Sequence, residues 1–177
     1  ADYIVTDPTL FTRETFDLII VFDSGDLRYA GVADHIAHLP EKPFIINIDH
    51  HATNEQYGDI NMVMTTASST AEVLYRFFTY SDIAIDAHTA TCLLTGLMTD
   101  TDQFTNGATS PGSLAIASDL IAKGGDVRLI RGNMFRNKSI AALKLWGVAL
   151  ARLNYLGTTP PIAYTYITQE DLRIHAV

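Results

Sequence analysis

The chain has 177 residues, of which 47% are hydrophobic and 18% are charged, and its formal net charge is −8. This composition supplies enough apolar side chains for a sizeable core and excludes an intrinsically disordered chain. The acidic balance argues against tight, unspecific binding of long nucleic acids, which depends on lysine and arginine, but it allows a small phosphate ester held by metal ions.

Cys92 is the single cysteine, so a disulfide framework is excluded and a reducing compartment, the cytoplasm, is expected. No apolar run approaches the roughly 18 residues of a membrane-spanning helix, and no signal peptide is visible. We therefore expect no membrane partner.

The first third of the chain has the pattern of a βαβ unit. Short apolar runs rich in isoleucine and valine at residues 17–23 and 43–49 predict strands buried on both faces. Apolar residues at helical spacing over 28–39 predict the connecting helix, and residues 59–64 predict a third strand. The expected fold class is α/β, with a parallel sheet and flanking helices.

Helical patterns follow. A capping-box spacing starts a helix at Ser69, and a leucine-rich stripe predicts another over 86–101. A third is predicted from the Ser110–Pro111 pair to the Gly124–Gly125 pair. Asp126 and Ser139 are expected to cap two more, the second a long helix over 140–156.

The pattern returns to a strand near the C-terminus. Alternating apolar residues over 160–168 predict a half-buried strand, and Thr168 is expected to cap a further helix. A strand after the long helix indicates a boundary near 157–160.

Acidic residues end both confident strands. Asp23 and Asp49 close residues 17–23 and 43–49, and parallel strands place their carboxyl ends at one edge of a sheet. His50 and His51 follow Asp49. Carboxylate together with imidazole suits Mn²⁺, Fe²⁺ or Zn²⁺ better than Ca²⁺ or Mg²⁺.

Adjacent residues in extended backbone point to opposite sides, so His50 and His51 are not expected to bind the same metal. One would be a ligand, and the other a substrate contact or an acid. Asp100, at the end of the leucine-rich helix, is a third carboxylate; if buried, it needs a cation or hydrogen-bond donors.

Structural interpretations compete with these assignments. Asp26 has the position of a simple turn residue, and Ser69 with Glu72 is first a capping box. Isolated histidines are more often surface or core residues than ligands; these are His35, His38, His88 and His175.

Four ordered stretches resemble motifs of the DHH phosphoesterase family. They are "VFDSGDLRYAG" (21–31), "IDHHATNEQYGDIN" (48–61), "ASSTAEVLYRFF" (67–78) and "LLTGLMTDTDQFTNGATSPGSLAIASDLIAKGGD" (93–126). The resemblance is greatest to the oligoribonuclease and phosphoadenosine-phosphate phosphatase branch, with RecJ-like exonucleases as relatives. It implies a hydrolase, a manganese-dependent phosphodiesterase or phosphatase that uses two metal ions.

The resemblance also implies roles for individual residues. Asp23 would bridge two Mn²⁺ ions, and His50 and Asp100 would complete the shell of the second. Asp49 would orient the imidazole without binding metal itself. His51 would contact the scissile phosphate or protonate the leaving group. Asn54 and Ser69 are candidates for phosphate contacts.

One departure from the family pattern is large. The family's first motif, His-x-x-x-Asp-x-Asp, does not occur before Asp23. We therefore expect an internal fragment of a longer enzyme, with one metal ion or none in this chain. The expected parts are a partial catalytic domain (1–138), a connector helix (139–157) and the start of a second small α/β domain for substrate binding (158–177).

Two functions remain open on the sequence alone. The first is hydrolysis of short single-stranded RNA or DNA oligomers or of small nucleotide phosphates. The alternative is a non-catalytic nucleotide-binding or interaction module with a degenerate site. A homodimer is one option, and the sequence leaves the oligomeric state open.

Overall fold

The computed structural model describes residues 9–135 and 139–175. The chain divides into two compact units, Ala1–Val127 and Arg128–Val177. The division into residues 1–138, 139–157 and 158–177 stays a prediction. No helix among the described residues is long and apolar enough to span a membrane.

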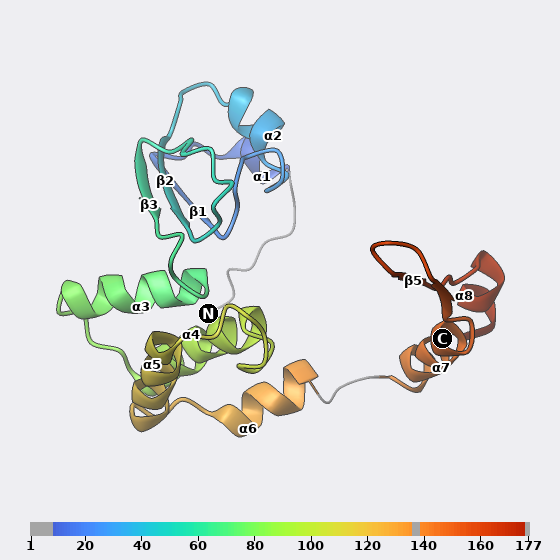
Figure 1. The fold of residues 1–177 in the computed structure, drawn as a ribbon. Coiled ribbons are helices and arrows are strands. Elements are labelled where there is room, and N and C mark those ends of the chain that lie inside the picture. Colours follow the sequence, from blue (N-terminus) through green and yellow to red (C-terminus); the bar gives the residue numbers. More distant parts are fainter. Residues whose placement is uncertain (1–8, 136–138, 176–177) are drawn as a thin grey trace. The chain divides into compact units, whose positions relative to one another are not determined.

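The first unit contains the predicted parallel sheet (Figure 1). Its strands are β1 (Leu18–Phe22), β2 (Phe44–Asp49) and β3 (Ile60–Val63), which lie in chain order with β2 in the centre. The registers Phe22↔Ile48 and Asp49↔Val63 align the carboxyl ends of neighbouring strands. The predicted α/β class with a parallel sheet and flanking helices is therefore confirmed.

The predicted helix over 28–39 is wrong in extent. Only α2 (Ala33–Ala37) is helical there, and a short helix that was not predicted, α1 (Leu10–Arg13), precedes the sheet. Gly31 adopts a φ of +73°, which a helix does not allow. The Asp26 carboxylate accepts the backbone N–H groups of Arg28 and Tyr29 at 2.7 and 2.8 Å, so this segment is a turn.

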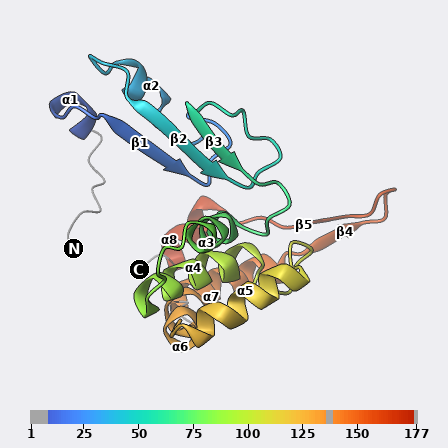
Figure 2. The ribbon, with the colours of Figure 1, turned by 90° about the vertical axis from the view of Figure 1, so that its left-hand side faces the viewer.

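Three helices pack beyond the carboxyl ends of the strands (Figure 2). They are α3 (Thr70–Tyr80), α4 (Ala87–Asp100) and α5 (Pro111–Ala122); α3 packs on β2 and α4, and α4 packs on α5. Side-chain oxygens of Ser69 and Ser110 cap the first and last of them, as predicted. The leucine stripe of α4 is buried: Leu93, Leu94, Leu97 and Met98.

Glu72 of α3 is buried, with 1% of its surface exposed, and its carboxylate anchors the start of this helix. Oε2 accepts the N–H and hydroxyl of Ser68 at 2.9 and 2.7 Å, and Oε1 accepts two N–H groups of Arg76 at 3.0 and 2.6 Å. Burial alone would raise the pKa of Glu72, but the hydrogen bonds from Ser68 and the ion pair with Arg76 lower it below the ordinary 4.5.

Glu72→Gln is expected to lower the free energy of unfolding by about 1–3 kcal/mol at pH 7, because a neutral amide weakens these bonds. Because the pKa of Glu72 in the folded chain lies below the ordinary 4.5, its carboxylate contributes fully to the free energy of unfolding above pH 4.5. This stabilisation is lost as the pH falls through the folded-state pKa. Urea unfolding at pH 7 and at a lower pH measures this effect. The difference in unfolding free energy between Glu72→Gln and wild type should be smaller at the lower pH. Glu41→Gln, at an exposed position, is the control; an equal effect there would contradict the assignment.

The second unit is built from short elements after α6 (Val127–Ile130) and a π-helical turn (Arg131–Phe135). Its further elements are α7 (Ile140–Ala151), β4 (Asn154–Leu156), β5 (Ile162–Tyr164) and α8 (Gln169–His175). Ser139 caps α7 as predicted.

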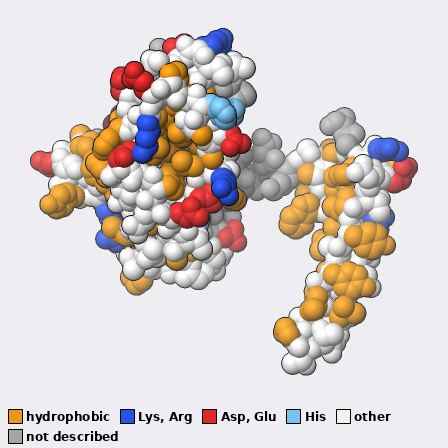
Figure 3. Space-filling model, turned by 90° about the horizontal axis from the view of Figure 1, so that it is seen from above, with side chains coloured by type: hydrophobic (Ala, Val, Ile, Leu, Met, Phe, Trp, Pro, Cys, Tyr) orange, Lys and Arg blue, Asp and Glu red, His pale blue; other side chains and the backbone are white. Residues whose placement is uncertain are grey.

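The predicted helix over 140–156 is too long. It ends at Ala151 because residues 154–156 instead pair antiparallel with β5, with Tyr155 opposite Ala163. Helical periodicity could not reveal this pairing. β5 is also shorter than 160–168 and is exposed along its length, not half-buried. Figure 3 shows the exposed hydrophobic side chains of both units.

Candidate metal centre

Two acidic residues lie at the carboxyl edge of the sheet, where the sequence places them. Asp23 follows the last residue of β1, and its N–H donates to the carbonyl of Ile48 at 3.0 Å. Its φ of +58° is left-handed, a conformation that aspartate tolerates better than most residues. Asp49 ends β2 and is fully buried. Parallel pairing of β1 with β2 brings the two carboxylates into one site.

The rings of His50 and His51 lie together, with centroids 4.4 Å apart. The expectation that they point to opposite sides is therefore wrong. The reason is that β2 ends at Asp49, so the alternation of an extended strand does not continue through the histidines. Both imidazoles contribute to the same cluster.

His50 faces two carboxylates from different elements. Its Nε2 lies 3.5 Å from Oδ1 of Asp23 and 3.7 Å from Oδ2 of Asp100, the last residue of α4. The Nδ1 atom lies 3.3 Å from the carbonyl oxygen of Ala67. A carbonyl only accepts hydrogen bonds, so Nδ1 is the donor in this contact, and Nε2 is the His50 atom that faces the two carboxylates.

Asp49 orients His51 and not the ring of His50. Its Oδ1 lies 2.7 Å from Nδ1 of His51, and it also accepts the backbone N–H of His50 at 2.7 Å. The other oxygen accepts from the Asn54 amide at 2.5 Å. Burial would raise the pKa of Asp49, but these bonds lower it on balance. The hydrogen bond to Asp49 raises the pKa of His51 above 6.5, against the opposing effect of burial.

Asp49→Asn is expected to lower the pKa of His51 toward its ordinary 6.5, because the charged acceptor at Nδ1 is lost. In wild type, His51 therefore stays protonated to a higher pH than in the variant. NMR titration of the imidazole in the metal-free chain measures the difference. Asp34→Asn, an exposed carboxylate in α2, is the control. An unchanged His51 titration in Asp49→Asn would contradict this coupling.

The donor set fits a divalent cation. One ligand atom from each of Asp23, Asp49, His50 and His51 lies within 4.8 Å of the others. Burial, followed by repulsion from Asp23, raises the pKa of Asp100. Crowded carboxylates beside imidazole nitrogens are the surroundings that a cation stabilises. The cluster could therefore hold a metal ion.

Two of the predicted phosphate contacts, Asn54 and Ser69, have partners within the protein. Ser69 is fully buried and its hydroxyl caps α3 by accepting the Glu72 N–H at 3.1 Å. The Asn54 amide donates to Asp49 and to the Ser24 carbonyl and pairs with the side chain of Asn47. Direct phosphate contacts of these residues stay predictions, although both side chains already position other groups.

Asn47 was not predicted as part of the site. It is fully buried in the centre of β2, and its amide donates to Asn54 at 2.8 Å and to Asn61 at 2.9 Å. The signal was a polar residue inside the apolar run "FIINI", because a buried amide needs partners. This network fixes the loop that follows the histidines.

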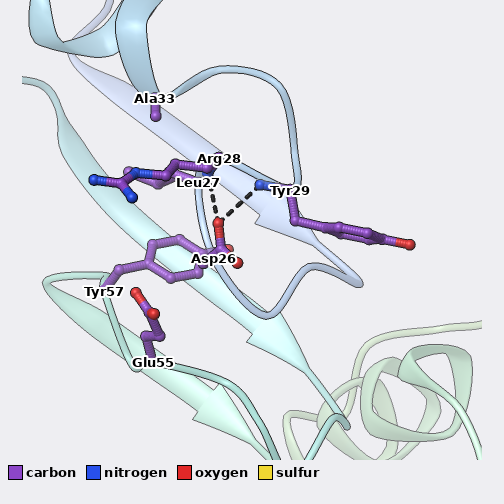
Figure 4. Close-up of a pocket in the computed structure, with 7 residues that line it drawn as sticks. All are labelled: Asp26, Leu27, Arg28, Tyr29, Ala33, Glu55 and Tyr57. Carbon is purple, nitrogen blue, oxygen red and sulfur yellow. Dashed lines mark hydrogen bonds between the residues drawn. The ribbon is translucent and has the colours of Figure 1, made fainter.

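A separate recess of about 590 Å³ lies beside the turn after β1 (Figure 4). It contains none of the predicted site residues. Tyr57 donates its hydroxyl to the Ser24 carbonyl at 3.0 Å, and burial, followed by the Asp49 and Asp26 carboxylates, raises its pKa to about 12. The lining residues are Asp26, Leu27, Arg28, Tyr29, Ala33, Glu55 and Tyr57.

Two curated proteins have sequences similar to that of this chain. A bifunctional oligoribonuclease and PAP phosphatase NrnA of Thermus thermophilus is 34% identical over 131 residues, which are 69% of this chain and 40% of that protein. A Streptococcus mutans protein is 36% identical over 110 residues, 56% of this chain and 36% of its own. The chain thus spans less than half the length of these curated relatives.

A solved structure supports the fold. The crystal structure of an exopolyphosphatase-related protein from Bacteroides fragilis superposes on this chain with a TM-score of 0.78 and 28% sequence identity. The superposed region covers 95% of this chain and 49% of the Bacteroides chain. The N-terminal domain of the DHH family matches residues 1–97, more than half of the 177. The chain therefore belongs to the DHH family.

Proposed function

We propose that this chain is the metal-binding part of a manganese-dependent phosphoesterase that hydrolyses short oligonucleotides or nucleotide phosphates. The observation that carries the proposal is the convergence of Asp23, His50 and Asp100, with Nε2 of His50 within 3.7 Å of both carboxylates. Similarity to the Thermus thermophilus relative, named for oligoribonuclease and PAP phosphatase activity, supports the substrate class.

The side chains of the cluster have different proposed roles. Asp23, His50 and Asp100 would hold one metal ion, and Asp23 would be shared with a second ion in the two-metal site that the DHH resemblance implies. A bound cation would supply activation of water and neutralisation of phosphoryl charge. The mixed carboxylate and imidazole donors suit Mn²⁺, Fe²⁺ or Zn²⁺. The resemblance to the DHH phosphoesterases favours Mn²⁺ among these ions.

His51 is suited to the substrate side of the site. Its Nδ1 faces Asp49, which leaves Nε2 free for a phosphate oxygen or a leaving group, and 47% of its side chain is exposed. Because its pKa is raised, more of it is protonated near neutral pH. An imidazolium there can bind a phosphate oxygen or donate a proton to the departing one.

The test measures hydrolysis of short RNA oligomers and of phosphoadenosine phosphate with Mn²⁺. Two proteins are compared: this chain, and this chain extended at its N-terminus by the corresponding segment of the Thermus relative. We expect Mn²⁺-dependent hydrolysis by the extended protein and its loss in His50→Ala. Full activity after His50→Ala, or none in any protein, would refute the proposal. Nucleotide binding that ignores Mn²⁺ would favour a non-catalytic binding module.

A further inference from the structure

Thr70, the first residue of α3, makes a contact that no assigned role explains. Its hydroxyl donates to Oδ1 of Asp23 at 2.7 Å, across 47 positions of sequence. Only 6% of Thr70 is exposed, so its hydroxyl needs a partner within the protein. A carboxylate only accepts hydrogen bonds, so the proton belongs to Thr70.

The contact restrains Asp23 without using up its capacity for a metal. Half of the Asp23 side chain is exposed, and its Oδ1 lies near the imidazoles of His50 and His51 and accepts from Thr70. Each carboxylate oxygen has two lone pairs, so the Thr70 hydroxyl occupies one of four. The same Oδ1 lies 3.5 Å from Nε2 of His50, so the bond to Thr70 sets the direction in which this oxygen meets the imidazole.

Several hydrogen bonds hold the start of α3 in place. Ser69 caps the helix, and the buried Glu72 carboxylate binds the N–H and hydroxyl of Ser68. One residue earlier, the Ala67 carbonyl faces Nδ1 of His50. Residues 67–70, here the ASST segment, therefore hold Asp23 through a side chain and His50 through the backbone.

We propose that Thr70 is a positioning residue: its hydroxyl orients the Asp23 carboxylate toward His50, so that both are presented to one divalent cation. The metal part of this inference rests on the proposed function. Partners that orient metal ligands typically change affinity about 10- to 100-fold when they are removed. Loss of the Thr70 hydroxyl should therefore weaken metal binding without unfolding the chain.

The experiment titrates Mn²⁺ into this chain by calorimetry and compares three variants. Thr70→Val keeps the shape and removes the hydroxyl; about 10-fold weaker binding is expected. Thr70→Ser keeps a hydroxyl at this position and should bind Mn²⁺ as tightly as wild type does. Thr79→Val is the matched control, because Thr79 lies on the same helix, its hydroxyl donates to the carbonyl of Tyr75, and it is not a member of the metal cluster. Thermal unfolding checks that each variant is folded.

A metal-free measurement separates this proposal from the proposed function. In wild type without metal, the Thr70 hydroxyl proton should exchange slowly enough for detection by NMR and lie near Asp23. If wild type binds no Mn²⁺ but this proton is detected, the metal-dependent function fails and the positioning contact stands. An undetected proton, or equal Mn²⁺ affinity in wild type and Thr70→Val, overturns the positioning role.

Discussion

Asp23→Asn is expected to weaken Mn²⁺ binding by at least about 100-fold, more than the loss of an orienting partner does. The Asp23 carboxylate faces both imidazoles: its Oδ1 lies 3.5 Å from Nε2 of His50 and 3.9 Å from Nδ1 of His51. The amide keeps the shape but removes the negative charge. Calorimetric titration of the chain with Mn²⁺ measures the loss.

The backbone conformation of Asp23 supplies a matched control. Asp23 has a φ of +58°, and asparagine also tolerates this left-handed region, so the substitution should not unfold the turn. Asp82, after α3, has a φ of +55° and lies outside the cluster. Asp82→Asn should bind Mn²⁺ as wild type does. Equal affinity in Asp23→Asn and wild type would remove Asp23 from the metal site.

The position of the site followed from a single feature of the sequence. Two apolar runs ended in Asp23 and Asp49, and parallel pairing places such ends at one edge whatever the details of the connection. The connection itself was predicted poorly, since α2 covers only Ala33–Ala37. The error was local because strand direction, and not helix length, decides where the carboxylates lie.

The orientation of side chains within the site could not be predicted in the same way. Alternation holds only within a strand, and β2 ends one residue before His50. The choice of His51 as the partner of Asp49, and of Ala67 as the partner of His50, depends on how the loop after Asp49 meets the start of α3. These are tertiary contacts without a periodic signal.

The second unit shows the opposite case, in which a strong local pattern was overridden. Residues 140–156 have helical composition throughout, yet β4 forms over Asn154–Leu156. A guanidinium–carboxylate pair between Arg152 and Asp171 connects the end of α7 with α8. Contacts with segments further along the chain therefore determine where this helix ends.

The second large effect is expected in the helical layer that carries Asp100. Leu94 is fully buried in α4, which packs between α3 and α5. Leu94→Ala should lower the free energy of unfolding of the first unit by about 2–5 kcal/mol, because it removes buried methyl groups and leaves a cavity. Leu114→Ala, in α5 where 48% of the leucine is exposed, should cost clearly less. Urea unfolding of both variants measures the difference.

The same substitution tests whether the site depends on the packing beneath it. Leu97 and Met98, also buried, connect Leu94 to Asp100 at the end of α4. A cavity at Leu94 loosens this turn, so Oδ2 of Asp100 is held less firmly at 3.7 Å from Nε2 of His50. Mn²⁺ affinity should then fall in Leu94→Ala and stay unchanged in Leu114→Ala. A destabilised Leu94→Ala variant with wild-type Mn²⁺ affinity would show that α4 does not position Asp100 through its core.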